Sequence, residues 1–339
     1  MKNWSLPKML LAGVTVGLLL FALAANFIFS NNGTDVEPTA NPSPTLTREG
    51  ETGQLKVVAS TRVWAEITEL IGGEWVDVEV LVPDNQDPHS FQASARDQLA
   101  VSEAELVIAN GGGYDDFMDQ LIAASESELI FLKLVEGEHS HSDDPEAHPG
   151  EDTIAEIEFT NEHIWFDFNA TLIAAEQIAE AIVELRPEAQ SSVNAGFDFF
   201  TMEISNLEIR VEALRERALG LGFIATENVA NLMLEDAGFV DLTPPDLADA
   251  VEQDREVPLA ALSQAEELLK NKVAELLVVN ISTTDQTTQA LISAAEAGSR
   301  PIVRVSETGF IEVPGQDPEL LSYLDWMAWV IDQLQEAIY

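Results

Sequence analysis

The sequence predicts an α/β fold of two similar Rossmann-like lobes with parallel sheets, joined by a long rigid helix. Short apolar runs alternate with segments of helical periodicity, which is the pattern of parallel sheets covered by helices on both faces. The order of these segments occurs twice, and an uninterrupted helical segment lies between the two occurrences. With 339 residues, the chain is long enough for two domains that each have a core.

Residues 1–53 are predicted to lie outside the fold. Lys2 and Lys8 precede an apolar run from Met9 to Phe29, which is long enough to cross a bilayer of about 30 Å. Residues 1–29 are therefore interpreted as a signal peptide or an N-terminal membrane anchor, and the anchor is favoured because the run continues past the small-residue pattern Ala22-Leu23-Ala24. Both interpretations place the rest of the chain outside the cytoplasm, at the cell surface or in the periplasm. Residues 30–53 are rich in Asn, Pro, Thr and Gly, which is typical of a flexible linker.

The first lobe is predicted to span residues 54–186. Its strands are expected in four apolar runs, Leu55–Ser60, Val76–Val82, Leu106–Ala109 and Leu129–Leu134. Apolar residues at helical spacing predict helices at Trp64–Ile71, Ala93–Ala104 and Ala170–Leu185. Ser94 is a good N-cap for the second of these helices.

A connecting helix is predicted over residues 187–219, and at about 1.5 Å per residue it is long enough to tie two lobes together. The second lobe is predicted over residues 220–339. Its strands are expected at Phe223–Glu227, Val240–Asp246, Ala274–Asn280 and Ile302–Ser306, with helices at Val229–Ala237 and Leu320–Ile338. These segments repeat the order of the first lobe, so we expect two lobes of one plan.

The composition narrows the classes of function. The chain has 60 acidic and 16 basic residues and a formal net charge of -44. Such a surface repels phosphate and excludes nucleic acid as a partner. It suits a cation ligand, or it indicates either adaptation to salt or solubility through self-repulsion. There are no cysteines, which excludes disulfides, cysteine-ligated zinc, a thiol nucleophile and a lipid-modified N-terminal cysteine.

Four residues are candidate metal ligands because they lie near the carboxyl ends of predicted strands, where ligands gather in open parallel sheets. They are His89, His163, Glu227 and Glu307. Two come from each lobe, which predicts one shared site between the lobes. Two imidazoles and two carboxylates suit Zn²⁺ or Mn²⁺.

Each candidate also has a purely structural interpretation. His163 lies in the apolar stretch Asn161–Asp167 and is then an ordinary core histidine, while His89 is a turn residue after Asp87-Pro88. Glu227 precedes a predicted helix and is then its N-cap, and Glu307 is a solvated side chain.

A second group of histidines lies in an acidic loop. His139, His141 and His148 fall among carboxylates between Glu136 and Asp152, a stretch without apolar periodicity. Such a loop is expected to bind divalent metals weakly, as a capture or sensing element, or to be only a solvated acidic loop. The run Gly111-Gly112-Gly113 lacks the Lys-Ser/Thr of a phosphate loop, so it is interpreted as a turn.

Five short stretches together carry a resemblance to a known family. They are Asp87–Phe91, Asn110–Phe117, Asn161–Trp165, Ala225–Asn228 and Leu242–Pro245. With them, the chain from about residue 55 to residue 339 resembles the extracytoplasmic solute-binding proteins of zinc/manganese ABC importers, the cluster A-I proteins, and looks most like the actinobacterial members.

The resemblance implies that the metal is held between the lobes by the positions of His89, His163, Glu227 and Glu307. Zinc-type members have a histidine at the position of Glu227. Manganese-type members have a glutamate there and an aspartate at the last position, where this chain has Glu307. The acidic histidine loop resembles that of zinc members, so Zn²⁺ is expected, with Mn²⁺ as the alternative.

The function that the resemblance implies is capture of the metal outside the membrane and delivery to an ABC permease and its ATPase subunit. We expect a monomer that is not an enzyme, because four protein ligands leave no open position on the metal. The alternatives are a metal-dependent surface adhesin and an exported metal-dependent hydrolase.

Overall fold

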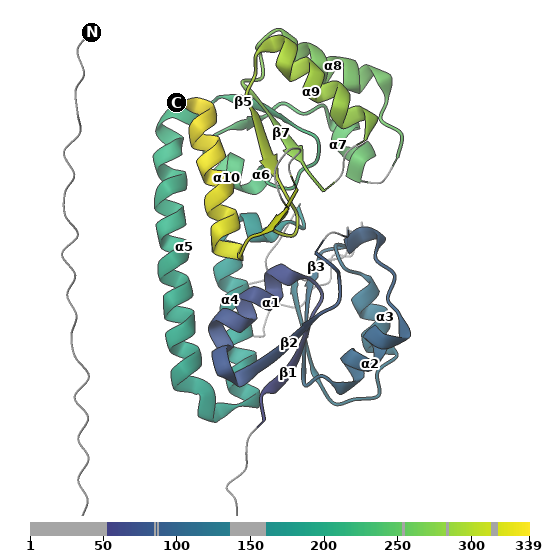
Figure 1. Cartoon of the computed structure of the whole chain (residues 1–339), viewed down its shortest axis with the longest axis vertical. Helices are drawn as coiled ribbons and strands as arrows, with labels where there is room; N and C mark the ends of the chain where they lie inside the picture. The colour runs from purple at the N-terminus through teal and green to yellow at the C-terminus, as the bar shows by residue number, and fades with distance from the viewer. Residues whose placement is uncertain are drawn as a thin grey trace, which may run out of the picture. The chain divides into compact units, whose positions relative to one another are not determined.

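The computed structural model describes residues 53–84, 86, 88–135, 161–252, 255–282, 285–312 and 318–339 (Figure 1). The predicted anchor at residues 1–29, the linker up to residue 52 and the loop with His139, His141 and His148 lie outside these ranges. No helix within the described ranges is long and apolar enough to cross a membrane. All described residues belong to one compact unit, and the predicted boundaries at residues 187 and 220 fall within it and stay predictions.

The first sheet has four parallel strands in the order β2-β1-β3-β4. They are β1 (Leu55–Ala59), β2 (Val76–Val80), β3 (Leu106–Gly111) and β4 (Ile130–Val135). Strand β2 ends two residues before the predicted end, but the N–H groups of Leu81 and Val82 still donate to the carbonyls of Ala59 and Ser60. The chain therefore leaves the sheet gradually, toward the loop that carries His89.

The second sheet has the same plan, with four parallel strands in the order β6-β5-β7-β8. They are β5 (Gly222–Ala225), β6 (Val240–Asp241), β7 (Leu276–Asn280) and β8 (Ile302–Val305). The matching strand order confirms the predicted pair of similar α/β lobes. A small antiparallel pair, β9 (Phe310–Ile311) and β10 (Glu319–Leu320), follows the second sheet.

The helices of the first lobe are α1 (Arg62–Gly72), α2 (Ala95–Glu103), α3 (Phe117–Ala123) and α4 (Phe168–Leu185). The predicted N-cap of α2 is confirmed: Ser94 Oγ accepts from the N–H of Asp97, and the Asp97 side chain accepts from the N–H of Ser94. This reciprocal pair satisfies donors that the first helical turn leaves unpaired.

The helices of the second lobe are α6 (Asn231–Asp236), α7 (Pro245–Glu252), α8 (Leu259–Lys270), α9 (Gln286–Gly298) and α10 (Tyr323–Ile338). Helices α3, α7, α8 and α9 are additions to the predicted order. Helix α6 is shorter than predicted and its N-cap is Ala230, so the alternative interpretation of Glu227 as its cap is wrong.

The long helix α5 (Gln190–Ala218) follows a 3-10 turn, Pro187–Ala189, and has 29 residues. It packs against α1 and α4 of the first lobe and against α6 and α10 of the second; Figure 1 shows it running beside α10. Its buried residues recur every three or four positions from Phe200 to Ala218, and Val193 lies two turns before Phe200 on the same face. The helix therefore buries one continuous face against both lobes.

Successive strand residues point to opposite faces of each sheet, so the hydrophobic clusters on the two faces are separate. Val57 and Phe223 belong to the largest cluster, which also contains α1, α4, α5 and α10 side chains and is continuous between the lobes. Their neighbours Val58 and Ile224 belong to two separate outer clusters, under α2 and α3 in the first lobe and under α7, α8 and α9 in the second. The helices on the inner side thus join the two lobes.

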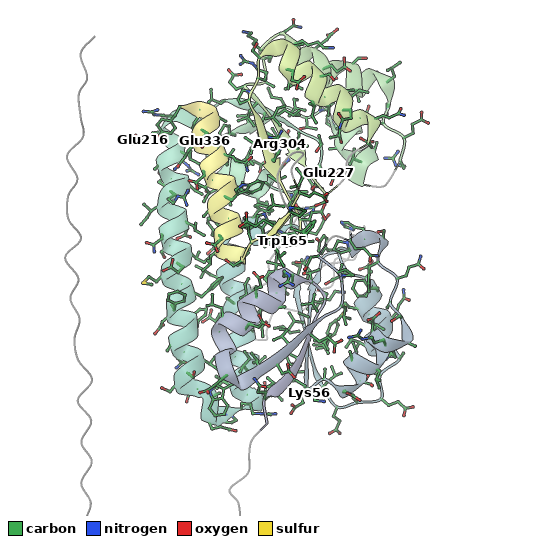
Figure 2. The ribbon with its side chains drawn as sticks, viewed as in Figure 1. Lys56, Trp165, Glu216, Glu227, Arg304 and Glu336 are labelled. Atoms are coloured by element: carbon green, nitrogen blue, oxygen red, sulfur yellow. The ribbon has the colours of Figure 1, made fainter. Side chains whose placement is uncertain are left out.

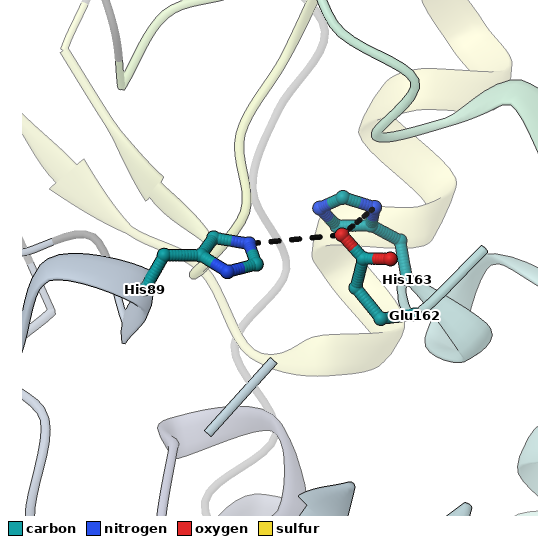
Figure 3. Close-up of side chains that lie close together, drawn as sticks. All are labelled: His89, Glu162 and His163. Carbon is teal, nitrogen blue, oxygen red and sulfur yellow. Dashed lines mark ion pairs between the residues drawn. The ribbon is translucent and has the colours of Figure 1, made fainter. Parts of the chain in front are cut away.

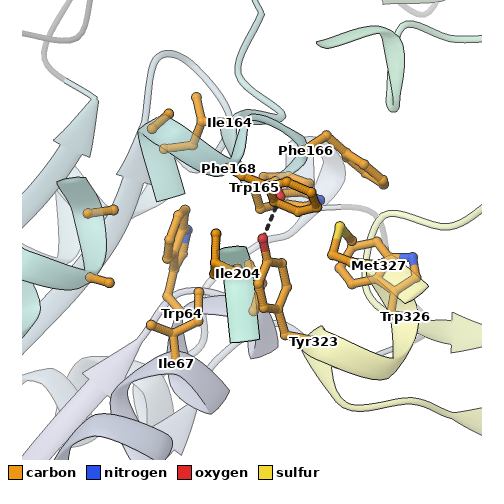
Figure 4. Close-up of a cluster of buried hydrophobic side chains, with 14 of the residues drawn as sticks. Trp64, Ile67, Ile164, Trp165, Phe166, Phe168, Ile204, Tyr323, Trp326 and Met327 are labelled. Carbon is orange, nitrogen blue, oxygen red and sulfur yellow. Dashed lines mark hydrogen bonds between the residues drawn. The ribbon is translucent and has the colours of Figure 1, made fainter. Parts of the chain in front are cut away.

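Aromatic side chains concentrate in one part of this shared core (Figure 4). Trp165, Phe166, Tyr323 and Trp326 are all buried there. The hydroxyl of Tyr323 donates to the carbonyl oxygen of Trp165 at 2.7 Å, so α10 fixes the segment that begins at Asn161.

Candidate metal centre

His163 is at the start of a short 3-10 turn, Ile164–Phe166, and is only 3% exposed. The rings of Tyr114 and Trp165 contact it edge-on, with centroids at 5.6 Å and 5.2 Å. The next two residues, Trp165 and Phe166, are buried in the shared core. Burial of its neighbours therefore fixes the backbone on which this imidazole sits.

Asn161 determines which nitrogen of His163 carries the proton. Its Oδ1 accepts from the His163 N–H at 2.9 Å, and its Nδ2 donates to the Asn228 carbonyl at 2.8 Å, so the orientation of the amide is set. His163 Nδ1 lies 2.8 Å from the same Oδ1 and must donate to it, because an amide oxygen has no proton. The lone pair is then on Nε2, which is the state in which an imidazole binds a metal.

Burial also keeps His163 neutral. Loss of hydration lowers its pKa from 6.5 to about 4, and the nearby imidazole of His89 acts in the same direction against the carboxylate of Glu162. Protons therefore compete weakly with a metal for His163 at neutral pH.

His89 is in the 3-10 turn Pro88–Ser90, and its side chain is 38% exposed. Its ring meets Tyr114 edge-on at 5.0 Å. Tyr114 thus lies between the two histidines, and it is itself held by the turn after β3, where Asp115 accepts from the N–H groups of Asn110 and Gly111 at 2.7 Å and 2.8 Å. Burial raises the pKa of that Asp115 carboxyl.

Glu162 is a third polar residue at this place that sequence reasoning did not predict. Its Oε1 lies 3.7 Å from His89 Nε2 and 3.9 Å from His163 Nδ1 (Figure 3), and ligand atoms of these three residues lie within 4.8 Å of one another. The only sequence signal was adjacency to His163. Because His163 Nδ1 donates to Asn161, its metal-binding nitrogen is Nε2, on the side of the ring toward His89 in Figure 3.

The second lobe contributes two carboxylates. Glu227 follows β5 (Figure 2) and Glu307 follows β8, where it is 6% exposed. Asn280, the last residue of β7, donates from Nδ2 to Glu227 Oε2 at 2.5 Å and to Glu307 Oε1 at 2.7 Å. One buried amide therefore holds both carboxylates, which come from different loops.

All four predicted residues, His89, His163, Glu227 and Glu307, line one cavity of about 730 Å³, and Glu162 is not among its lining residues. The loops of the two lobes also touch directly. Tyr114 Oη donates to Glu307 Oε2 at 3.4 Å, and Thr308 Oγ1 donates to the carbonyl of Asp84 at 2.5 Å. The structure thus places two nitrogen and two oxygen donors around one cavity, a set that suits a borderline divalent ion. Among the described residues, only His89, His163 and Glu162 form a group of three with ligand atoms within 4.8 Å of one another, and Glu227 and Glu307 lie outside that group.

The fold of two parallel-sheet lobes is that of known metal-binding proteins. The periplasmic zinc binding protein TroA from Treponema pallidum superimposes with a TM-score of 0.65 at 15% identity, over 84% of this chain and 99% of that one. A zinc-bound deletion mutant of ZnuA gives a TM-score of 0.64 at 19% identity, over 84% and 98%. At these identities the likeness establishes the fold.

Residues 57–337 match the family model of ZnuA, described as zinc-uptake complex component A, periplasmic, and the chain belongs to this family. It is 24% identical over 200 residues to the metal ABC transporter substrate-binding lipoprotein SsaB of Streptococcus sanguinis, covering 57% of this chain and 58% of that protein. It is 27% identical over 170 residues to the manganese ABC transporter substrate-binding lipoprotein PsaA of Streptococcus anginosus, covering 48% and 52%. The matches span a little over half the length of these relatives. The predicted family resemblance is confirmed.

Proposed function

We propose that this protein is an extracytoplasmic solute-binding protein that captures a divalent transition metal ion for an ABC importer. The observation that carries the proposal is the convergence of His89, His163, Glu227 and Glu307, from both lobes, on one cavity. His163 presents a neutral imidazole whose Nε2 has its lone pair, and the two carboxylates bring negative charge to a site for a cation.

We propose His89, His163, Glu227 and Glu307 as the ligands, with Zn²⁺ as the preferred ion and Mn²⁺ as the alternative. Zinc binds imidazole nitrogen and carboxylate oxygen at about 2.0–2.2 Å, in sets of four. Similar proteins are named for manganese and iron, and solved ones for zinc. Glu162 is the alternative oxygen donor on the first lobe, because it approaches both histidines.

The partners in this proposal are a permease and its ATPase subunit, to which the protein delivers the ion as a monomer. Membrane attachment through residues 1–29 and weak metal capture by His139, His141 and His148 are further parts of it. The protein is proposed as a carrier and not an enzyme, because four protein ligands fill a tetrahedral shell and leave no position for an activated water.

Elemental analysis after mild purification, followed by competition titration with Zn²⁺ and Mn²⁺, tests the proposal. We expect close to one tightly bound ion per chain. Absence of any tightly bound transition metal contradicts it. Hydrolysis of esters or phosphates that a chelator abolishes favours a metal-dependent hydrolase instead, and metal-independent binding to a surface partner favours an adhesin.

A further inference from the structure

Asn280 is a fully buried amide that contacts the side chains of both second-lobe carboxylates. Its orientation is fixed from the other side, because the N–H of Ser282 donates to its Oδ1 at 3.0 Å. Its backbone N–H donates to Thr226 Oγ1 at 3.0 Å. The amide nitrogen therefore has to face Glu227 and Glu307, and it cannot rotate without losing the bond from Ser282.

The first lobe has an equivalent asparagine with different contacts. Asn110 is near the end of β3, as Asn280 is at the end of β7, and it is also fully buried. Its Oδ1 accepts from Trp64 Nε1 at 3.1 Å, and its Nδ2 donates to the backbone carbonyls of Gly111 and Glu162, both at 3.0 Å. Asn110 thus supports backbone, whereas Asn280 holds the two side chains that face the cavity.

We propose that Asn280 is a positioning residue that sets how the two carboxylates bind metal and thereby favours zinc over manganese. This inference rests on the proposed function. Each carboxylate gives one oxygen to the Asn280 amide, Oε2 in Glu227 and Oε1 in Glu307. An oxygen engaged in a bond of 2.5–2.7 Å is a weaker metal ligand than the second oxygen of the same carboxylate. In Glu307 that second oxygen, Oε2, receives only the longer bond of 3.4 Å from Tyr114 Oη, so the Asn280 amide favours metal binding through one oxygen of each carboxylate.

Single-oxygen binding by two glutamates and single-nitrogen binding by two histidines give four donors. Zinc prefers this number in a tetrahedron, whereas manganese suits six oxygen-rich positions. Without the amide, each carboxylate loses the short bond that engages one of its oxygens, so both of its oxygens become available to the ion. The coordination number then rises, and the advantage of zinc decreases.

The test compares Asn280→Ala and Asn110→Ala with the unchanged protein, all as the full chain stripped of metal. Competition titration gives the affinities for Zn²⁺ and for Mn²⁺, and X-ray absorption gives the number of zinc ligands. Changes to residues behind the ligands typically lower affinity about 10- to 100-fold. We expect a loss of this size for zinc in Asn280→Ala, a loss for manganese of less than about threefold, and an increase from four zinc ligands to five or six.

Asn110→Ala is the matched control, because it removes an equally buried amide that touches no carboxylate of the second lobe. We expect it to lower both affinities by the same factor and to leave the zinc shell at four. If Asn280→Ala does not fold, Asn280→Leu replaces it, since this change keeps a side chain of similar size and adds no charge while removing the donor.

Equal losses of zinc and manganese affinity in the Asn280 variant, or an unchanged number of zinc ligands, overturn the inference. That result is distinct from failure of the proposed function, in which the unchanged protein binds neither ion tightly.

Discussion

The two halves of the candidate metal centre are held by different interactions. In the first lobe, His163 is enclosed by the rings of Tyr114 and Trp165, and burial keeps it neutral. In the second lobe, Glu227 and Glu307 are held by hydrogen bonds from Asn280. Burial against aromatic rings thus disfavours protonation of His163, whereas hydrogen bonds from Asn280 orient the two carboxylates.

The imidazole and the carboxylates differ in what they need in order to be buried. A neutral imidazole loses little when it is buried, so an aromatic pocket suits it, but a buried carboxylate needs hydrogen bonds to offset its lost hydration. Exposure does not follow this division, since the side chain of His89 in the first lobe is 38% exposed whereas His163 in the same lobe is buried. Variants that affect one half alone separate the two kinds of interaction.

Removal of the buried imidazole is expected to have the largest effect. His163→Ala removes a proposed ligand, the neutral imidazole, so tight metal binding should be lost. The affinity should fall by more than about 100-fold, the upper range for changes behind the ligands. Competition titration measures it. Ser94→Ala is the control, because Ser94 is not among the residues that line the cavity, and it should leave the affinity unchanged. Unchanged affinity in His163→Ala would place the site elsewhere.

Acid is expected to lower the free energy of unfolding of the metal-free protein, through protonation of His163. Its pKa is about 4 in the folded state and 6.5 ordinarily, so between these values the unfolded chain binds the proton and the folded chain does not. Stability is therefore full above about pH 6.5 and is lost as the pH falls toward 4, by about 3 kcal/mol in total.

Urea unfolding at pH 7 and at pH 4.5 measures this loss, with His163→Gln as the control that lacks the titrating ring. The difference in pH dependence between the two proteins isolates His163 from the many carboxylates. Identical pH dependence of both proteins would contradict the assigned burial effect.

Asn161→Ala is expected to have the next largest effect. It removes the acceptor that holds His163 in its Nδ1–H form and the bond to the Asn228 carbonyl, so metal affinity should fall about 10- to 100-fold. Nitrogen-15 spectra of the ring should change from one tautomer to a mixture. Asn161→Asp keeps the acceptor and should keep the tautomer. A ring that remains purely Nδ1–H in Asn161→Ala would refute the role of this amide.

Deletion of residues 139–148 is expected to have the smallest effect. His139, His141 and His148 are predicted to bind metal weakly and separately, so the affinity of the tight site should change by less than about twofold, within measurement error of competition titration. Only additional weak binding should disappear. Loss of tight binding on deletion would make the loop the principal site.

The fold was largely predictable because its signals are local. Apolar runs such as Leu106–Ala109 and Leu276–Val279 are too continuous for a one-sided strand, and their repeated order predicted two parallel sheets. The N-cap at Ser94 was predictable because its signal is also local: the capping box joins residues only three positions apart. Helices α8 and α9 were not predicted, although their buried residues lie at helical spacing, because those positions are mostly alanine or glycine and give a weak apolar signal.

The candidate site was only partly predictable. His89, His163, Glu227 and Glu307 were recognised by donor chemistry at strand ends, and they do line one cavity. Glu162 was not recognised, because its approach to His89 depends on a fold that brings residues 73 positions apart together. The sequence predicts Asn280 only as the last residue of a strand, because no local pattern shows that its amide faces two distant carboxylates.

The two-lobed parallel architecture, the residue types of the four candidate donors and the acidic composition could all be predicted from the sequence. These features depend only on residue type and on short-range periodicity. Three features required the tertiary structure: which nitrogen of His163 carries the proton, the lowered pKa of that ring, and the hydrogen bonds from Asn280 to Glu227 and Glu307. The physical reason is that hydration, hydrogen-bond geometry and charge interactions act across space, between segments that packing of the shared core brings together.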